Sequence, residues 1–172
     1  MNLFPAATLG ALVLACAATM GPPADPTPLT LGTFDSRALA IAYTGSEAFQ
    51  AHMADLHQQL ADAHAADDTA RVSELEALGP AMQARLHGQG FSTAPVDDLL
   101  EHIEDALPGI AADAGVDVIV SKWDLTYERE GLVLVDVTVA LAARFEPDER
   151  TWTSIREIMR QEPVALEELQ GH

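Results

Sequence analysis

The stretch that decides the fold is AGVDVIVSKWDLTYEREGLVLVDVTVALAARF, residues 114–145. Gly115 follows an alanine-rich segment and should end a helix, and the apolar, β-branched run at residues 116–120 predicts a short buried strand. Strand formers at residues 125–127, a turn at 128–131 and an apolar run at 132–135 predict a second strand region. Asp136 precedes another apolar-periodic run, so it should cap a helix that ends near Ala143.

Residues 29–34, upstream of this stretch, are a further strand candidate because they combine threonines with apolar side chains. Asp35 or Ser36 should cap a helix that begins near Arg37. Gly45 interrupts this helix early, and Ser46 can begin the next one.

The region from 46 to 115 is predicted to be helical. Its first part has apolar positions spaced by four and three residues, a seam that repeats every 3.5 residues and requires a second helix: Phe49, Met53, Leu56, Leu60 and Ala63. A tip at residues 66–69 leads into a return helix with its own apolar stripe: Val72, Leu75, Leu78, Met82 and Leu86. Two antiparallel helices can pair through these stripes, with a kink at Gly79 and Pro80 and a break at residues 87–95.

Two more helices are predicted towards the C-terminus. The first covers residues 96–114 and should pack on the strands, with a bend at Pro108. The second covers residues 151–160 and has Trp152, Ile155 and Met159 on one side. This tail helix either packs back onto the body or docks a partner.

Taken together, these pieces resemble the Skp/OmpH family of periplasmic chaperones. LGTFDSRALAIAY, residues 31–43, is similar to the family's first strand and first helix, and VDVIV, the Tyr127 segment and DVT are similar to its C-terminal part. The resemblance implies an α+β fold, in which a small β-sheet body carries a protruding antiparallel helical hairpin, here followed by a C-terminal helix. It also implies a trimer that joins through its strands and encloses unfolded outer-membrane proteins between its arms. The arm here, at about 46–87, is shorter than the family's, and the best-known members are basic.

The charge balance excludes several classes of partner. The 172 residues include 27 acidic and 9 basic ones, giving a net charge of −18. Nucleic acid is not an expected partner, because no cluster of Lys and Arg is present to neutralise phosphates. Anionic lipid surfaces should repel the chain for the same reason.

The N-terminus has the pattern of an exported protein. Residues 4–20 carry no charge and are too few to span a bilayer comfortably, so residues 1–20 are interpreted as a signal peptide. Cys16 lies at a sequence that resembles a lipoprotein processing site, whereas cleavage after Ala15-Cys16-Ala17 would remove it. A Pro-rich spacer at 21–28 precedes the Skp/OmpH-like domain at 29–145 and the helical tail at 146–172.

The sequence contains no motif for catalysis or for a cofactor. His52, His57 and His64 lack the i, i+4 spacing of helical metal ligands, so we expect no metal site. The chain has no phosphate-binding glycine loop and no nucleophile elbow, and we therefore do not expect an enzyme.

The function that these observations favour is a periplasmic holdase that binds unfolded outer-membrane or envelope proteins as a homo-oligomer, a trimer by resemblance. Its candidate client-binding residues are Phe49, Met53, Leu56, Leu60, Val72 and Leu75. The same residues can instead serve only to pair the two helices. An alternative is an envelope lipoprotein or adaptor that binds one folded partner, with a lipid on Cys16 as its only link to the membrane. A third hypothesis is an envelope protein that binds a metal ion weakly, through His64 with Asp67 or Asp68 on its arm.

Overall fold

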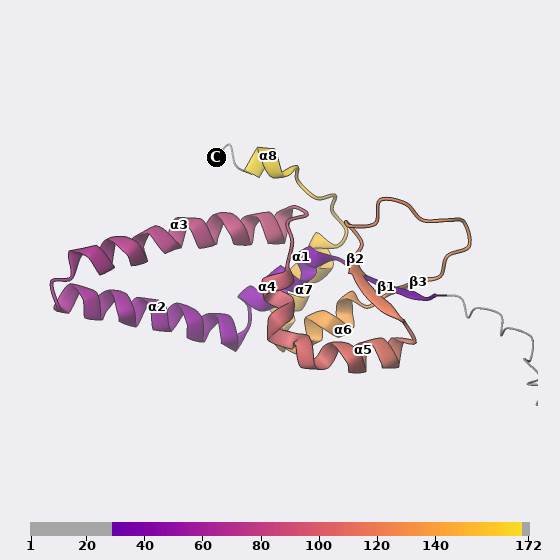
Figure 1. The fold of residues 1–172 in the computed structure, drawn as a ribbon, viewed down its shortest axis with the longest axis horizontal. Helices are drawn as coiled ribbons and strands as arrows, with labels where there is room; N and C mark the ends of the chain where they lie inside the picture. Colours follow the sequence, from indigo (N-terminus) through magenta and orange to yellow (C-terminus); the bar gives the residue numbers. More distant parts are fainter. Residues whose placement is uncertain (1–28, 170–172) are drawn as a thin grey trace, which may run out of the picture.

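The computed structural model describes residues 29–169, which combine many helices with one small sheet (Figure 1). The predicted signal peptide at 1–20, the processing alternatives at Cys16 and the spacer at 21–28 lie outside the described residues. None of the helices from residue 29 to residue 169 is both long enough and apolar enough to cross a bilayer.

The sheet has three parallel strands, β1 (Leu31–Phe34), β2 (Val118–Ser121) and β3 (Leu134–Asp136), in the order β2-β1-β3. Leu31 lies opposite Val118 on one side and Leu134 on the other. The prediction of strands at 29–34 and 116–120 is therefore confirmed to within two residues at each end, and the two share a ladder.

The prediction of a strand at residues 125–127 is wrong. Residues 122–133 form the loop between β2 and β3, in which Tyr127 is 82% exposed. The reason is topological: β2 and β3 lie on either side of β1 and point the same way, so the chain must return along the sheet, which requires about a dozen residues.

Three helices follow β1, and two of them form an arm. Helix α1 (Ser36–Thr44) begins at Asp35, whose side chain accepts a hydrogen bond from the backbone N–H of Arg37. Helix α2 (Glu47–Ala65) is capped by Ser46, as predicted. Helix α3 (Thr69–Phe91) follows the turn at residues 66–68. Helices α2 and α3 contact each other and project side by side away from the sheet, and we call this pair the arm (Figure 1).

The arm extends further than predicted. Helix α3 continues through Pro80 and through the glycines near its end to Phe91, so the break occupies residues 92–96 rather than 87–95. A glycine costs a helix only about 1 kcal/mol relative to alanine. Packing of α3 against both α1 and α2 can offset that cost.

The helix predicted for residues 96–114 is divided into three segments. They are α4 (Asp97–Leu100), the 3-10 helix η1 (Glu101–Ala106) and α5 (Leu107–Ala114). Ile103 has φ −127° and ψ 15°, outside the helical region. Pro108 lies in the first turn of α5, where its missing N–H leaves no bond unmade, and Gly115 ends that helix at φ +66°.

The C-terminal part packs back onto the body. Asp136 accepts a 2.8 Å hydrogen bond from the N–H of Thr138 at the start of α6 (Thr138–Ala142), which continues as the 3-10 turn η2 (Ala143–Phe145). Helix α7 (Glu149–Ile158) buries Ile155 in the core, and Trp152 packs against the same core. Of the two alternatives for the tail helix, this is the one in which it packs back onto the body. A short helix that was not predicted, α8 (Leu166–Leu169), contacts α3.

The core lies between one face of the sheet and the surrounding helices. Its largest fully buried apolar side chains come from four helices: Leu39, Leu99, Leu141 and Ile155. Phe34 adds the contribution of β1. The sheet and the base of the arm are therefore held by one continuous core.

Candidate functional site

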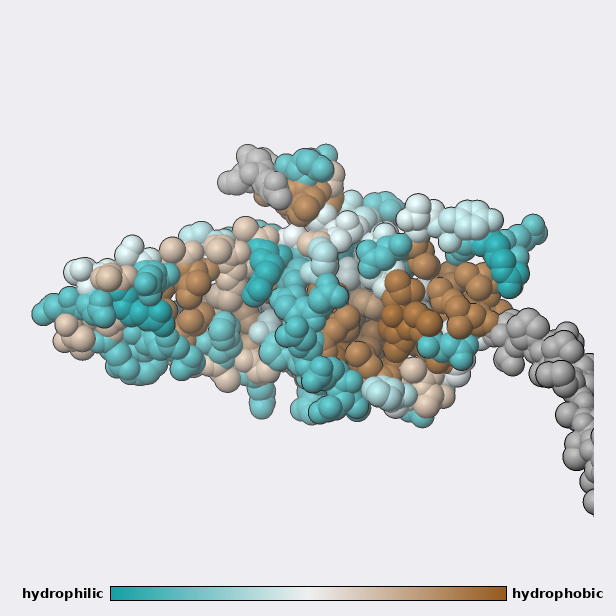
Figure 2. All heavy atoms as spheres, viewed as in Figure 1, coloured by the Kyte–Doolittle hydropathy of each residue, from teal (hydrophilic) through white to brown (hydrophobic). Residues whose placement is uncertain are grey.

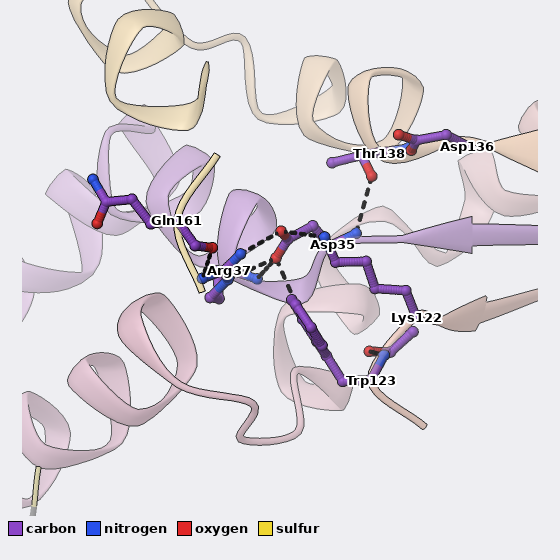
Figure 3. A network of polar contacts seen from close by, with 8 residues as sticks. Asp35, Arg37, Lys122, Trp123, Asp136, Thr138 and Gln161 are labelled. Carbon is purple, nitrogen blue, oxygen red and sulfur yellow. Dashed lines mark hydrogen bonds and ion pairs between the residues drawn. The ribbon is translucent and has the colours of Figure 1, made fainter. Parts of the chain in front are cut away.

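A network of polar contacts lies at the carboxyl ends of β1 and β2 (Figure 3). At its centre is the buried Asp35 carboxylate. It accepts hydrogen bonds from Arg37 Nε at 3.0 Å and Arg37 Nη2 at 2.8 Å, and Lys122 Nζ lies 2.8 Å from Oδ2. Trp123 Nε1 donates at 3.4 Å, and its ring lies under both cations, with Lys122 Nζ 4.3 Å and Arg37 Cζ 4.9 Å from the ring centre.

The surroundings of Asp35 hold it in the charged form. Burial alone would raise its pKa, but the hydrogen bonds and positive charges of Arg37 and Lys122 outweigh burial and lower the pKa below 3.8. A carboxylate with a low pKa, engaged by two cations, is a poor general base at neutral pH.

The network connects three parts of the chain. Arg37 Nη1 donates to the backbone carbonyl of Gln161 at 3.0 Å, beyond the end of α7, and the N–H of Asp35 donates to Thr138 Oγ1 at 2.9 Å at the start of α6. The loop after β2 contributes Lys122 and Trp123. These contacts support a structural role that joins β1, the β2–β3 loop and the C-terminal segment.

The second candidate site is an apolar groove where the arm meets the body. Its volume is about 450 Å³, and it is open to solvent along one side. Three helices supply the lining, with Ala40, Ile41 and Thr44 from α1, Phe49 and Met53 from α2, and Gly79, Met82, Gln83, Leu86, His87, Gly90 and Phe91 from α3. The lining contains no Asp, Glu, Lys or Arg side chain. We call this site the arm groove.

Aromatic contacts fix the walls of the arm groove. The ring of Phe49 packs edge-on against Tyr43, with 5.4 Å between ring centroids, and Tyr43 belongs to the core. Phe91 packs edge-on against His87 at 5.8 Å and is 47% exposed. Met53 and Met82 add flexible thioether side chains, which adapt readily to different apolar surfaces.

The arm as a whole carries predominantly negative charge. Residues 47–91 contain seven acidic side chains and two basic ones, a net charge of −5. Both arginines already face carboxylates: Arg71 pairs with Glu74 at 3.1 Å, and Arg85 pairs with Asp98 at 3.3 Å. Within residues 29–169, none of the other six carboxylates of the arm has an ion-pair partner. Figure 2 shows hydrophilic side chains over much of the far end of the arm.

The structure separates the six predicted client-binding residues into two groups. Phe49 and Met53 line the arm groove. The remaining four lie further along the arm, where Leu75 is buried and the other three are half-buried: Leu56, Leu60 and Val72. The second group is placed to pair α2 with α3.

Several groove residues were not predicted as binding residues. Met82 and Leu86 belong to the apolar stripe of the return helix, and that stripe was the signal that could have identified them. Ile41 and Phe91 come from outside both stripes. Ile41 reaches the groove because α1 lies beside α3, and Phe91 reaches it because α3 continues beyond its predicted end.

A third feature is the face of the sheet that the helices leave open. The register places Leu31 between Val118 and Leu134 on this face. Val118 and Leu134 are exposed, and Val133 beside them is 60% exposed. Figure 2 shows hydrophobic side chains gathered at the end of the molecule that holds the strands.

The histidines of the arm are the residues that the sequence analysis considered as metal ligands. His52, His57 and His64 are all exposed on α2, and no group of three or more metal-ligating side chains occurs between residues 29 and 169. The arm groove and the open sheet face are two apolar surfaces of the described chain. Comparison with protein-family models, curated proteins and solved structures finds no match to this chain.

Proposed function

We propose that the protein is a holdase-type chaperone of the periplasm, which binds apolar segments of unfolded outer-membrane or envelope proteins and performs no catalysis. The observation that carries the proposal is the arm groove. Two helices that paired along their whole length would leave no apolar surface for a client. Here Phe49 and Met53 line an open cavity of about 450 Å³ instead of being sealed between α2 and α3.

The arm suits this role if it is the antiparallel helical hairpin of a Skp/OmpH-like chaperone. Burial of client apolar surface would supply binding energy at about 25 cal/mol per Å². The unpaired carboxylates on the arm would keep loaded complexes apart, because like charges repel.

The open sheet face supports a homo-oligomer, a trimer if it follows the resembled family. An exposed apolar row next to strand edges with unpaired backbone groups is a surface that proteins usually cover. A second copy of the chain would cover Val118 and Leu134. Light scattering tests this: the purified protein should have the mass of an oligomer, and Leu134→Lys should lower that mass towards a monomer. A monomeric wild-type protein would refute the assembly.

Chaperoning is tested by diluting an unfolded β-barrel outer-membrane protein into buffer with a molar excess of the purified protein. Turbidity should stay low at both low and moderate salt. The matched control is an equal amount of an unrelated acidic protein of similar size. Aggregation at the same rate in both samples would refute the holdase function.

A further inference from the structure

The arm groove has an apolar floor, and the helices that form it carry an excess of negative charge. Its lining contains no Asp, Glu, Lys or Arg side chain, whereas the arm as a whole carries a net charge of −5. The two arginines of the arm are already engaged by Glu74 and Asp98. A partner that brings positive charge would therefore be attracted to the arm, because six of its carboxylates have no ion-pair partner among residues 29–169.

The size of the groove limits what can enter it. A cavity of about 450 Å³ is at the lower end of the range for small-molecule pockets, about 300–1,000 Å³. Such a volume suits one or two large side chains rather than a whole helix. The aromatic rings of Phe49 and Phe91 and the thioethers of Met53 and Met82 favour an aromatic occupant.

We propose that the arm groove binds an aromatic side chain of a polypeptide segment in which Lys or Arg residues flank that side chain. The aromatic ring enters between α1, α2 and α3, and the flanking cations face the carboxylates of the arm. This inference rests on the proposed chaperone function and narrows its clients to unfolded segments in which basic residues neighbour aromatic ones.

Gly90 is a position from which the groove can be filled. It lines the groove, and a Cβ added there would meet no atom within 4 Å outside its chain neighbours and the adjacent backbone of α3. A leucine at this position should occupy the space that the client side chain needs. Gly109 in α5 also has open space around its Cβ and does not line the groove, so Gly109→Leu is the matched control. Met82→Lys is a second test, which places a positive charge in the groove.

The experiment measures the binding of three labelled peptides by fluorescence anisotropy. They share one central aromatic segment, flanked by lysines, by serines or by glutamates. The lysine-flanked peptide should bind about tenfold or more tighter than the glutamate-flanked peptide at low salt, and the difference should shrink near 1 M salt, where screening acts over about 3 Å. Gly90→Leu and Met82→Lys should each weaken its binding about tenfold or more, and Gly109→Leu should leave binding unchanged.

Methyl NMR locates the bound peptide. The signals of Met53 and Met82 should shift on titration, whereas Met159, at the end of α7, should not. Equal binding of the lysine- and glutamate-flanked peptides would overturn the charge preference. Unchanged binding by both groove variants, or unchanged signals of Met53 and Met82, would overturn the site.

The two proposals fail in different ways. If the lysine-flanked peptide binds the groove but the protein does not suppress aggregation, the groove assignment stands and the holdase function is wrong. If Gly90→Leu and Met82→Lys suppress aggregation as well as wild type does, the holdase function stands and the groove is not its client site.

Discussion

Asp35→Asn tests whether the buried polar network holds the fold together. Asparagine has nearly the same shape and still caps a helix, so the N-terminus of α1 keeps its hydrogen bond. What is lost is one negative charge between two cations. The substitution also turns an amide donor towards Arg37 or Lys122, which can only donate.

The magnitude follows from the burial of the partners. Arg37 is fully buried, so removing its counterion should cost about 3–5 kcal/mol. Lys122 is 36% exposed, and water can solvate it, so the loss of its ion pair with Asp35 should cost less than about 1 kcal/mol. With a urea m-value of about 1–3 kcal/mol/M, the unfolding midpoint should fall by more than about 1 M.

The assay is urea unfolding followed by tryptophan fluorescence, because Trp123 lies against both cations. The control is Asp136→Asn: Asp136 is an exposed carboxylate that accepts a hydrogen bond from the N–H of Thr138, the first residue of α6, and no ion pair reaches it from any residue of the described chain. Asparagine can accept the same hydrogen bond, so the control should change stability by less than about 0.5 kcal/mol. Equal losses in the two variants at pH 7 would refute the reasoning.

Acid provides a second test of the same network. The folded-state pKa of Asp35 is lowered, so its stabilisation is present above the unfolded pKa, about 3.9, and is lost as the pH falls through the lower folded value. The gap in stability between wild type and Asp35→Asn should be constant from pH 7 to about pH 5 and should narrow below pH 4. A gap that stays the same at the lowest pH would show that the charge of Asp35 is not responsible.

Three further predictions concern packing and can be measured by the same urea assay. A Cβ at Gly45 would lie 2.7 Å from Thr151 Oγ1 between α1 and α7, so Gly45→Ala should lower the free energy of unfolding by about 1–3 kcal/mol. Adding Thr151→Ala should restore most of that stability, and additive losses in the double variant would contradict the clash. Leu75 is buried between the arm helices and Leu78 is 46% exposed, so Leu75→Ala should cost about 2–4 kcal/mol and Leu78→Ala less than about 1 kcal/mol. Similar losses in the two variants would contradict the pairing of α2 with α3 through Leu75. Pro80→Ala should stabilise the protein by up to about 3 kcal/mol, because proline removes a helical hydrogen bond within α3. A loss of stability would mean instead that the proline shapes the arm groove.

Local chemistry in the sequence predicted much of the fold. The caps at Asp35 and Ser46 and the helix end at Gly115 lie where their side chains or backbone freedom indicated. The strands around residues 31 and 118 were visible as short apolar runs between helix signals. These features depend on neighbouring residues, which is why one sequence suffices to locate them.

Features that depend on distant contacts were missed. The strand expected at residues 125–127 has the right composition, but β3 pairs with β1 and leaves this segment in the crossing loop. The break at Ile103 and the continuation of α3 to Phe91 are likewise decided by packing. The arm groove was predicted only in part, because periodicity places Phe49 and Met53 on a stripe but does not reveal that α1 lies beside α3.

The weak binding expected at one arm groove links the proposed binding function to the proposed oligomer. An aromatic side chain buries about 150–250 Å², and at about 25 cal/mol per Å² this gives roughly 4–6 kcal/mol before any ordering cost. A free energy near 4 kcal/mol corresponds to a dissociation constant of about 1 mM. One groove would therefore release its client quickly. Several grooves in one oligomer, engaging aromatic residues along the same unfolded chain, would raise the overall affinity by about 10²–10⁴ while each contact stays weak. The open face at Val118 and Leu134 would provide the surface for the proposed assembly, and the weakness of each groove would let a client leave segment by segment as it folds.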